Sequence, residues 1–208
     1  MNELKKFGLD IDEIIARFMK TFFEFYNSEK RENVSWSNLQ DYDLYKAGFF
    51  KNRKEEKEFV DGFFESTFFR EMPLVEGAKK GLRILERNFE INFITSRPSY
   101  IRDKTLVFLN KHFPDLKFNL FFSGEVYSRY KKSKEHKTKG EIAEEAGISF
   151  MVEDNPIYAV DCTKRGIKVF MINYPWNRHA EEHKNLIKVS GWKEILEKLN
   201  YMKGVKLK

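Results

Sequence analysis

The segment Phe7-Gly8-Leu9-Asp10-Ile11-Asp12 decides the fold of this 208-residue chain. Residues 7–11 form a short apolar run of the kind that makes a buried strand, and Asp10 and Asp12 stand at its C-terminal end. Carboxylates at the end of a buried strand are costly unless a cation or hydrogen bonds compensate them. The segment therefore predicts a central strand with a binding site beyond its end. The structural alternative is that Asp12 caps the following helix.

Four later apolar runs, residues 91–95, 118–122, 149–152 and 168–172, repeat this strand pattern. Helical stretches separate them. Residues 77–87 place Ala78, Leu82 and Leu85 on one helix face, and residues 139–146 form a second helix that stops at Gly147. Strands that alternate with helices predict parallel βαβ units. We therefore expect an α/β fold with a doubly wound, Rossmann-like parallel sheet.

Residues 15–72 interrupt this alternation, because they contain no convincing strand. Phe18, Phe22 and Phe25 fall on one helix face, and Phe59 and Phe63 share another. We expect a small helical cap domain at 15–72, inserted after the first strand, and a core domain made of residues 1–14 and 73–208. Aromatic residues at helical spacing are most simply the core of the cap itself. The aromatic residues outside these stripes are better candidates for lining a pocket: Trp36, Tyr42 and Tyr45.

Composition narrows the class of protein. Apolar residues make up 41% of the chain and charged residues 34%, which is typical of a soluble globular protein, and no apolar run is long enough to cross a membrane. A single cysteine suits a reducing compartment, so we expect a cytoplasmic protein. The net charge of +6 is dispersed and interleaved with Glu, so no stable nucleic-acid complex is expected. The oligomeric state stays open.

The strand ends are where chemistry is expected, because ligands of open α/β sheets bind beyond the carboxyl ends of the strands. The second strand ends in Thr95-Ser96-Arg97 and the fourth in Glu153-Asp154-Asn155. Several carboxylates near one point suit Mg²⁺, which prefers oxygen ligands. Arg97 has a fork suited to phosphate and is equally suited to an ion pair with a nearby carboxylate. A second Asp-x-Asp at residues 41–43 follows no strand and is interpreted as a polar loop.

Together these motifs resemble the haloacid dehalogenase (HAD) superfamily of phosphohydrolases. The resemblance implies that Asp10 is the nucleophile and Asp12 the general acid and base. It implies Mg²⁺ as cofactor, with Asp10, Asp12 and Asp154 as metal-binding residues. Glu153 would support the metal site from behind. The residues that would contact the phosphoryl group are Thr95, Ser96, Arg97 and Lys139, with Lys137 as the alternative to Lys139.

Three stretches are similar to the 5′(3′)-deoxyribonucleotidase-like branch of that superfamily: residues 94–98, 152–156 and 175–177. This resemblance implies an enzyme that hydrolyses nucleoside monophosphates. The alternatives are a phosphatase for another ester such as a sugar phosphate, and a protein that only binds phosphate or nucleic acid. Glu13 departs from the family pattern, which often has Gly there, so an additional carboxylate follows Asp12. Trp176 is interpreted as packing under the final helix.

Overall fold

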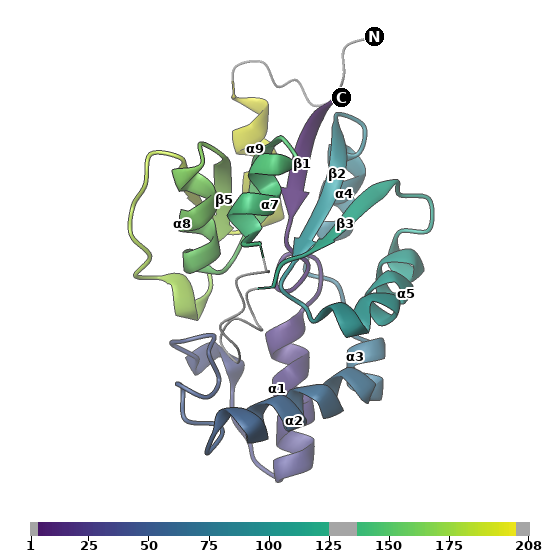
Figure 1. Cartoon of the computed structure of the whole chain (residues 1–208), viewed down its shortest axis with the longest axis vertical. Helices are drawn as coiled ribbons and strands as arrows, with labels where there is room; N and C mark the ends of the chain where they lie inside the picture. The colour runs from purple at the N-terminus through teal and green to yellow at the C-terminus, as the bar shows by residue number, and fades with distance from the viewer. Residues whose placement is uncertain (1–3, 125–136, 203–208) are drawn as a thin grey trace.

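A parallel sheet in the order β3-β2-β1-β4-β5-β6 organises the computed structural model, which describes residues 4–124 and 137–202 (Figure 1). All neighbouring strands in this part of the chain are parallel. The strands are β1 (Lys5–Leu9), β2 (Phe89–Thr95), β3 (Phe118–Phe122), β4 (Ile148–Glu153), β5 (Lys168–Ile172) and β6 (Leu186–Val189). The predicted α/β doubly wound fold is confirmed.

The strands differ in part from the sequence expectation: β1, β2 and β4 begin earlier, at Lys5, Phe89 and Ile148. The first strand ends at Leu9, so Asp10 is the first residue beyond it. The sixth strand, β6, escaped prediction because it has only four residues, three of them only partly buried. It lies at the sheet edge and pairs with β5 alone among the described strands. A short half-exposed edge strand gives little periodic signal in the sequence.

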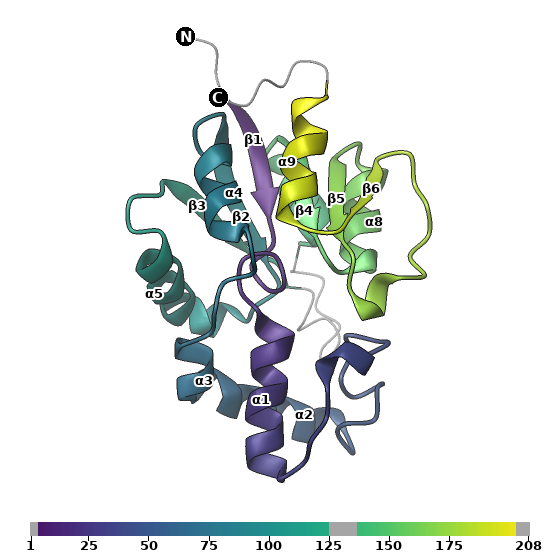
Figure 2. The ribbon, with the colours of Figure 1, turned by 180° about the vertical axis from the view of Figure 1, so that it is seen from behind.

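Helices cover both faces of the sheet. On one face lie α4 (Ala78–Leu85) and α9 (Trp192–Asn200), which stand in front in Figure 2. On the other lie α7 (Lys139–Glu145) and α8 (Pro156–Lys164). Each face has its own hydrophobic cluster, because alternate strand residues point to opposite sides. Helix α5 (Arg102–His112) lies at the β3 edge, after the short helix η2 (Ser99–Ile101).

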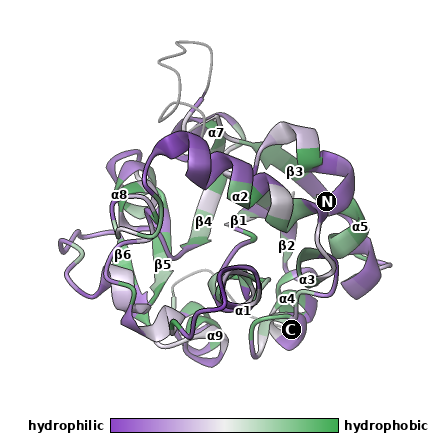
Figure 3. Cartoon of the chain, turned by 90° about the horizontal axis from the view of Figure 1, so that it is seen from below, coloured by the Kyte–Doolittle hydropathy of each residue, from purple (hydrophilic) through white to green (hydrophobic). Residues whose placement is uncertain are grey.

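The segment between β1 and α4 forms a helical group beyond the carboxyl end of β1 (Figure 1). It contains α1 (Phe18–Lys30), η1 (Trp36–Asn38), α2 (Arg53–Glu65) and α3 (Thr67–Arg70). Helix α2 runs across α1, which is seen end-on from below in Figure 3. The ring of Phe63 lies 5.3 Å from those of Phe18 and Phe22 and 5.5 Å from that of Phe25. These rings form an apolar centre for the helical group, as the spacing predicts.

Two crossings join the helical group to the sheet. The chain leaves β1 through a tight turn in which Glu13 has a positive φ of 61°, a conformation that is uncommon outside glycine. Ala16 then forms a bridge with Leu74, and the amide of Arg17 donates to the carbonyl of Pro73. The segments that leave and re-enter the sheet region therefore lie side by side. This turn holds residues 10–13 at the junction.

Candidate active site

Asp10 is held at the end of β1 by contacts on both carboxylate oxygens. Its Oδ1 accepts from the amide of Ile11 at 2.7 Å, and its Oδ2 lies 2.7 Å from Nζ of Lys139. The same Nζ donates to Oε2 of Glu153 at 3.0 Å. Lys139 is fully buried, at the start of α7, so the neighbouring strands β1 and β4 present two carboxylates to one buried ammonium group. Such a charge is tolerated inside a protein only when it is paired in this way.

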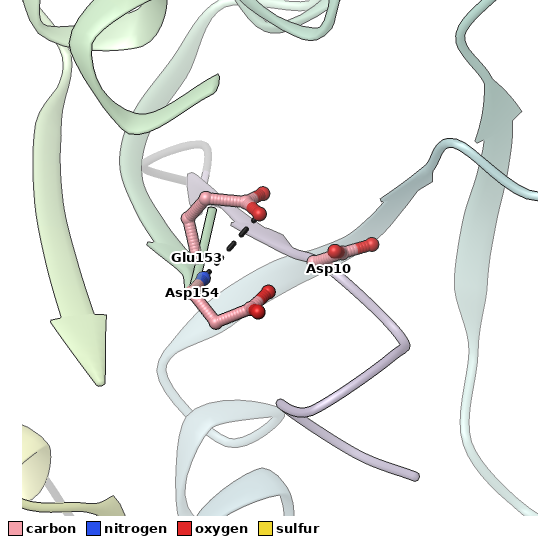
Figure 4. A group of neighbouring side chains, drawn as sticks. All are labelled: Asp10, Glu153 and Asp154. Carbon is pink, nitrogen blue, oxygen red and sulfur yellow. Dashed lines mark hydrogen bonds between the residues drawn. The ribbon is translucent and has the colours of Figure 1, made fainter. Parts of the chain in front are cut away.

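A group of three carboxylates lies at this point. Oxygens of Asp10, Glu153 and Asp154 all lie within 4.8 Å of one another, and Figure 4 shows the side chains converging from the ends of β1 and β4. Glu153 is already engaged, since its Oε1 accepts from the amides of Asp154 and Asn155. Asp10 and Asp154 are therefore the members best able to bind a cation. The donor set consists of hard oxygen ligands, so it fits Mg²⁺.

Burial and mutual repulsion raise the pKa values of these acids. Desolvation, with the charge of Glu153 second, raises the pKa of Asp10 to about 8. Desolvation raises the pKa of Glu153 to about 7, against the opposing effect of Lys139, and holds that of Asp154 well above its usual range. Burial would lower the pKa of Lys139, but Asp10 and Glu153 together raise it well above its ordinary value. The site has an excess of buried negative charge that a bound cation would neutralise.

Asp12 lies beside this group and is bound to Arg97. The Nη2 of Arg97 lies 2.6 Å from Oδ1 of Asp12, and its Nε lies 3.0 and 3.1 Å from the two oxygens. Helix α1 begins after Arg17 and has no side-chain cap, so the alternative in which Asp12 caps a helix is wrong. Of the two interpretations of Arg97, the ion pair is the one present in the structure.

The remaining side chains at the end of β2 have different environments. Thr95 is fully buried, and its hydroxyl accepts from the amide of Arg97 at 3.1 Å. The hydroxyl of Ser96 lies 3.0 Å from that of Ser123, which follows β3. The sequence analysis did not single out Ser123. The strand-end rule could have found it, because Ser123 is the first residue beyond β3. Ser96 and Arg97 line the cavity next to Asp10, whereas Thr95 is not among the residues that line it.

Glu13 points into the same region, as its departure from the family pattern suggested. Its side chain is almost completely buried, and Oε1 accepts from the amide of Met19 at 2.5 Å in the first turn of α1. Desolvation raises the pKa of Glu13 to about 8, and the nearby charges of Asp12 and Asp10 act in the same direction. The turn after Asp12 thus adds a further buried carboxyl group to the site.

Trp176 belongs to the same hydrophobic cluster as residues of the final helix, and it also contacts the site. Its indole Nε1 donates to Oδ2 of Asp154 at 2.9 Å, and its ring stacks on Tyr174 with centroids 4.8 Å apart. The side-chain amide of Asn177 donates from Nδ2 to the main-chain carbonyl of Asp154 at 2.7 Å. The tryptophan that joins the final helix to the core is Trp192, whose indole donates to the carbonyl of Ile14. The loop after β5 therefore holds Asp154 from two sides.

A cavity of about 200 Å³ opens between the strand ends and the helical group. Asp10, Asp12 and Asp154 line its floor. Phe18, Leu44, Val60 and Phe64 line the opposite side, together with the charged residues Glu56, Lys57 and Asp61. Tyr42 lines it as predicted, but Trp36 packs against Tyr174 and Trp176, and Tyr45 lies under the guanidinium of Arg53. Two further aromatic lining residues, Tyr100 and Tyr158, were not singled out in the sequence because they lie in helices of the sheet domain.

The structure separates the duplicated motifs. Lys137 is exposed and pairs with Glu145 on the surface, so Lys139 is the lysine that reaches Asp10. The second Asp-x-Asp also lies away from the carboxylate group: Asp43 forms a two-point ion pair with Arg53, with both distances 2.6 Å. Within residues 4–124 and 137–202, no helix is long and apolar enough to cross a membrane.

Comparisons with known proteins agree with this geometry. Residues 5–128 match the family model described as 5′ nucleotidase, deoxy (pyrimidine), cytosolic type C protein. The chain is 25% identical over 199 residues to "Putative nucleotidase OB0422" of Oceanobacillus iheyensis, covering 93% of this chain and 98% of that protein. It is 27% identical over 199 residues to "Putative nucleotidase YqfW" of Bacillus subtilis, covering 94% and 93%.

Solved structures show the same fold at low identity. The HAD-hydrolase YfnB from Bacillus subtilis, solved bound to magnesium, superposes with a TM-score of 0.60 at 12% identity, covering 96% of this chain and 100% of that one. The haloacid dehalogenase-like hydrolase SP0104 from Streptococcus pneumoniae gives 0.61 at 12% identity, covering 95% and 99%. These likenesses establish the HAD fold.

Proposed function

Because the chain belongs to the 5′ nucleotidase, deoxy (pyrimidine), cytosolic type C family, and is thus a phosphoric monoester hydrolase of the HAD fold, we propose that it dephosphorylates nucleoside monophosphates with Mg²⁺ as cofactor. Asp10 attacks the phosphorus atom and forms an aspartyl-phosphate, while the ester bond to the leaving oxygen breaks. Asp12 gives that oxygen its proton. Asp12 then takes a proton from water, which attacks the aspartyl-phosphate and releases inorganic phosphate.

The observation that carries this proposal is the environment of Asp10. Its Oδ2 lies 2.7 Å from Nζ of the buried Lys139, and the carboxylate lies at the floor of the cavity, next to Asp12. A nucleophile must be fixed in position and must be ionised when it attacks. Lys139 favours the ionised form of Asp10 and would also face an oxygen of the phosphoryl group. Ser96, which lines the cavity, would donate to another phosphoryl oxygen, and the buried Thr95 would fix this turn by accepting from the amide of Arg97.

Asp10 and Asp154 would hold the cation, with Asp12 contributing its main-chain carbonyl. When bound, Mg²⁺ would reduce the repulsion between the anionic nucleophile and the anionic phosphate. Glu153 is better placed to support this site than to bind the metal, because Lys139 and two main-chain amides already occupy its oxygens. Trp176 and Asn177 fix the orientation of Asp154.

We also propose that residues 15–72 act as a cap that selects the leaving group, on a core made of residues 1–14 and 73–208. The cap side of the cavity combines apolar side chains such as Phe18, Val60 and Phe64 with the charged residues Glu56, Lys57 and Asp61. Tyr42, Tyr100 and Tyr158 add aromatic surface to the walls. Flat apolar and aromatic surfaces suit a nucleobase, since stacking on an aromatic ring contributes about 1–3 kcal/mol per base. This supports a nucleoside rather than a small polyol as the leaving group.

The test is phosphate release from a panel of nucleoside and sugar monophosphates with and without Mg²⁺. Wild type is compared with Asp10→Asn and, as a matched control, with Asp41→Asn in the second Asp-x-Asp. We expect Mg²⁺-dependent release that Asp10→Asn abolishes and Asp41→Asn retains, with nucleoside monophosphates preferred. Equal release by wild type and Asp10→Asn would exclude Asp10 as the nucleophile, and a preference for sugar phosphates would reassign the substrate.

A further inference from the structure

Glu13 has one carboxylate oxygen, Oε2, for which the described residues provide no hydrogen-bond partner. The side chain is 5% exposed and lines the cavity. Its Oε1 is fixed by the amide of Met19 at 2.5 Å. Within the described residues, 4–124 and 137–202, no donor contacts its Oε2. Among the described residues, only Nε2 of His112 is a sealed side-chain atom without a hydrogen-bond partner, so Oε2 of Glu13 is not sealed. Because Glu13 lines the cavity, a hydrogen-bonding group of whatever fills the cavity can reach this oxygen.

The backbone at this position supports a role beyond packing. Glu13 adopts a positive φ of 61°, which is unfavourable for a side chain of this size and would be relieved by glycine. The turn itself is held by other groups: the amide of Glu13 donates to the carbonyl of Ala16, and its carbonyl accepts from the hydroxyl of Tyr174 at 2.8 Å. A glycine could therefore make the same turn without adding a carboxyl group to the cavity.

Glu13 lines the cavity between Asp12 and the start of α1. The residue follows Asp12, the proposed proton donor to the leaving oxygen, and the cavity continues from Glu13 to Phe18 and Met19 at the start of α1. The phosphoryl group would lie against Asp10 and Lys139. A carboxylate beside that dianion would repel it, so the neighbour that suits Glu13 is a neutral polar group.

We propose that Glu13 is a specificity-determining residue that hydrogen bonds to a sugar hydroxyl of the leaving group, a proposal that rests on the phosphohydrolase function above. A hydroxyl both donates and accepts, so it satisfies Oε2 whether the carboxyl group is ionised or protonated. In a nucleoside 5′-monophosphate, the ribose hydroxyls are the hydrogen-bond donors of the leaving group nearest to the ester oxygen. Glu13 thus selects a hydroxylated sugar over one that lacks the hydroxyl.

Three nucleotides that differ only in their ribose hydroxyls provide the probe: the 5′-monophosphates of uridine, 2′-deoxyuridine and 2′,3′-dideoxyuridine. Their affinities are measured by calorimetry with Mg²⁺ in an Asp10→Asn background, in which turnover is blocked, so the result does not depend on hydrolysis. Each is measured with Glu13, with Glu13→Gln and with Glu13→Met. The matched control is Glu58→Met, on an exposed part of α2 whose side chain is 67% accessible.

With Glu13 we expect at least one hydroxyl to strengthen binding by about 10- to 100-fold over the analogue that lacks it, the range for a hydrogen bond to a charged group. Glu13→Gln keeps polar atoms at both positions and should retain most of this ratio. Glu13→Met should bring the ratio close to one, and Glu58→Met should leave it unchanged. The ratio compares nucleotides with and without the hydroxyl on the same protein. A variant that binds all three nucleotides more weakly therefore keeps its ratio and cannot be mistaken for one that has lost the hydroxyl contact.

Equal affinities for the three nucleotides with Glu13, an unchanged ratio in Glu13→Met, or absence of binding by all three would overturn the proposal. Phosphate release by the protein with Asp10 intact is measured in parallel. Failure to release phosphate from any ester, with the affinity ratio present, would overturn the hydrolytic function and leave the hydroxyl contact standing. Phosphate release without any difference in affinity between the three nucleotides would support the hydrolytic function and overturn the hydroxyl contact.

Discussion

Arg97 holds Asp12 by both carboxylate oxygens, with Nη2–Oδ1 at 2.6 Å and Nε–Oδ2 at 3.0 Å. Arg97 is itself nearly completely buried. Its guanidinium lies 5.0 Å from the ring of Phe69 and 5.7 Å from that of Phe108, and Nη1 donates to Thr105. The proposed acid is therefore positioned by a side chain that contacts α3 in the helical group and α5 in the core.

This arrangement predicts that Arg97 acts on turnover more than on substrate binding. Lysine cannot reproduce the two-point contact, so Arg97→Lys should displace Asp12. Displacement of a reacting group by about 1 Å can cost about 10²-fold in rate. We expect kcat to fall on that scale with a smaller change in KM, measured by steady-state phosphate release. Arg83→Lys, at a partly exposed ion pair with Glu86, is the control and should be neutral. A rise in KM alone would indicate that Arg97 contacts the phosphate instead.

The two candidate lysines should differ sharply in their effect on stability. Lys139→Met leaves Asp10 and Glu153 buried without their shared cation, which for a buried pair costs about 3–5 kcal/mol. Lys137→Met removes a surface pair with Glu145 and should change the free energy of unfolding by less than about 0.5 kcal/mol. Urea unfolding of both variants without metal checks this. Similar free energies of unfolding for the two variants would contradict the buried contacts of Lys139 with Asp10 and Glu153.

Metal-free protein should lose stability as the pH rises from about 5 to about 8. The pKa values of Asp10 and Glu13 are raised to about 8 and that of Glu153 to about 7, mainly by desolvation. Over this range the folded state holds protons that the unfolded state has already released, so raising the pH favours unfolding. Mg²⁺ binds the ionised form and should restore stability most at the upper end. Thermal melts with chelator and with Mg²⁺ at several pH values test this, and rising stability in chelator would contradict it.

Trp176 should tune the affinity for the metal through Asp154. Trp176→Phe keeps an aromatic ring against Tyr174 but removes the indole donor that lies 2.9 Å from Oδ2 of Asp154. Loss of a hydrogen bond that orients a ligand typically weakens metal binding by about 10–100-fold. The Mg²⁺ concentration at half-maximal activity should rise accordingly. Trp36→Phe, which alters the same aromatic cluster without touching Asp154, is the control, and an equal effect of both variants would show that packing alone matters.

The packing of the final helix depends on the absence of a side chain at Gly81. A Cβ built there would lie 2.0 Å from the ring of Trp192, so Gly81→Ala should destabilise the fold by about 1–3 kcal/mol through overpacking. Gly62, inside α2, has open space at the same position. Gly62→Ala should therefore stabilise the protein by about 0.5–1 kcal/mol. Denaturant unfolding of the two variants tests both signs, and destabilisation by Gly62→Ala would contradict the second.

The sequence alone determined the sheet and the place of the site. Apolar runs such as residues 91–95 and 168–172 are short and bounded by helices, so burial forces them into parallel strands. Because parallel strands share one carboxyl edge, Asp10 and Asp154 had to meet once their strands were identified. The edge strand β6 was missed for lack of a periodic signal. The aromatic stripe of Phe18, Phe22 and Phe25 likewise indicated a helix face.

Only the tertiary structure decided which polar groups are partners. Arg97 and Asp12 are 85 residues apart, and Trp176 and Asp154 are 22 apart, and no local pattern specifies such pairs. Lys137 and Lys139 look alike in the sequence. In the structure, Lys137 points to solvent and pairs with Glu145, whereas Lys139, at the start of α7, points inward to Asp10. Hydrogen-bond partnership depends on distances of a few tenths of an ångström, whereas sequence periodicity only assigns residues to a face. The sequence thus identifies the polar residues that follow the strands. Which of them contact one another is decided only when the chain folds.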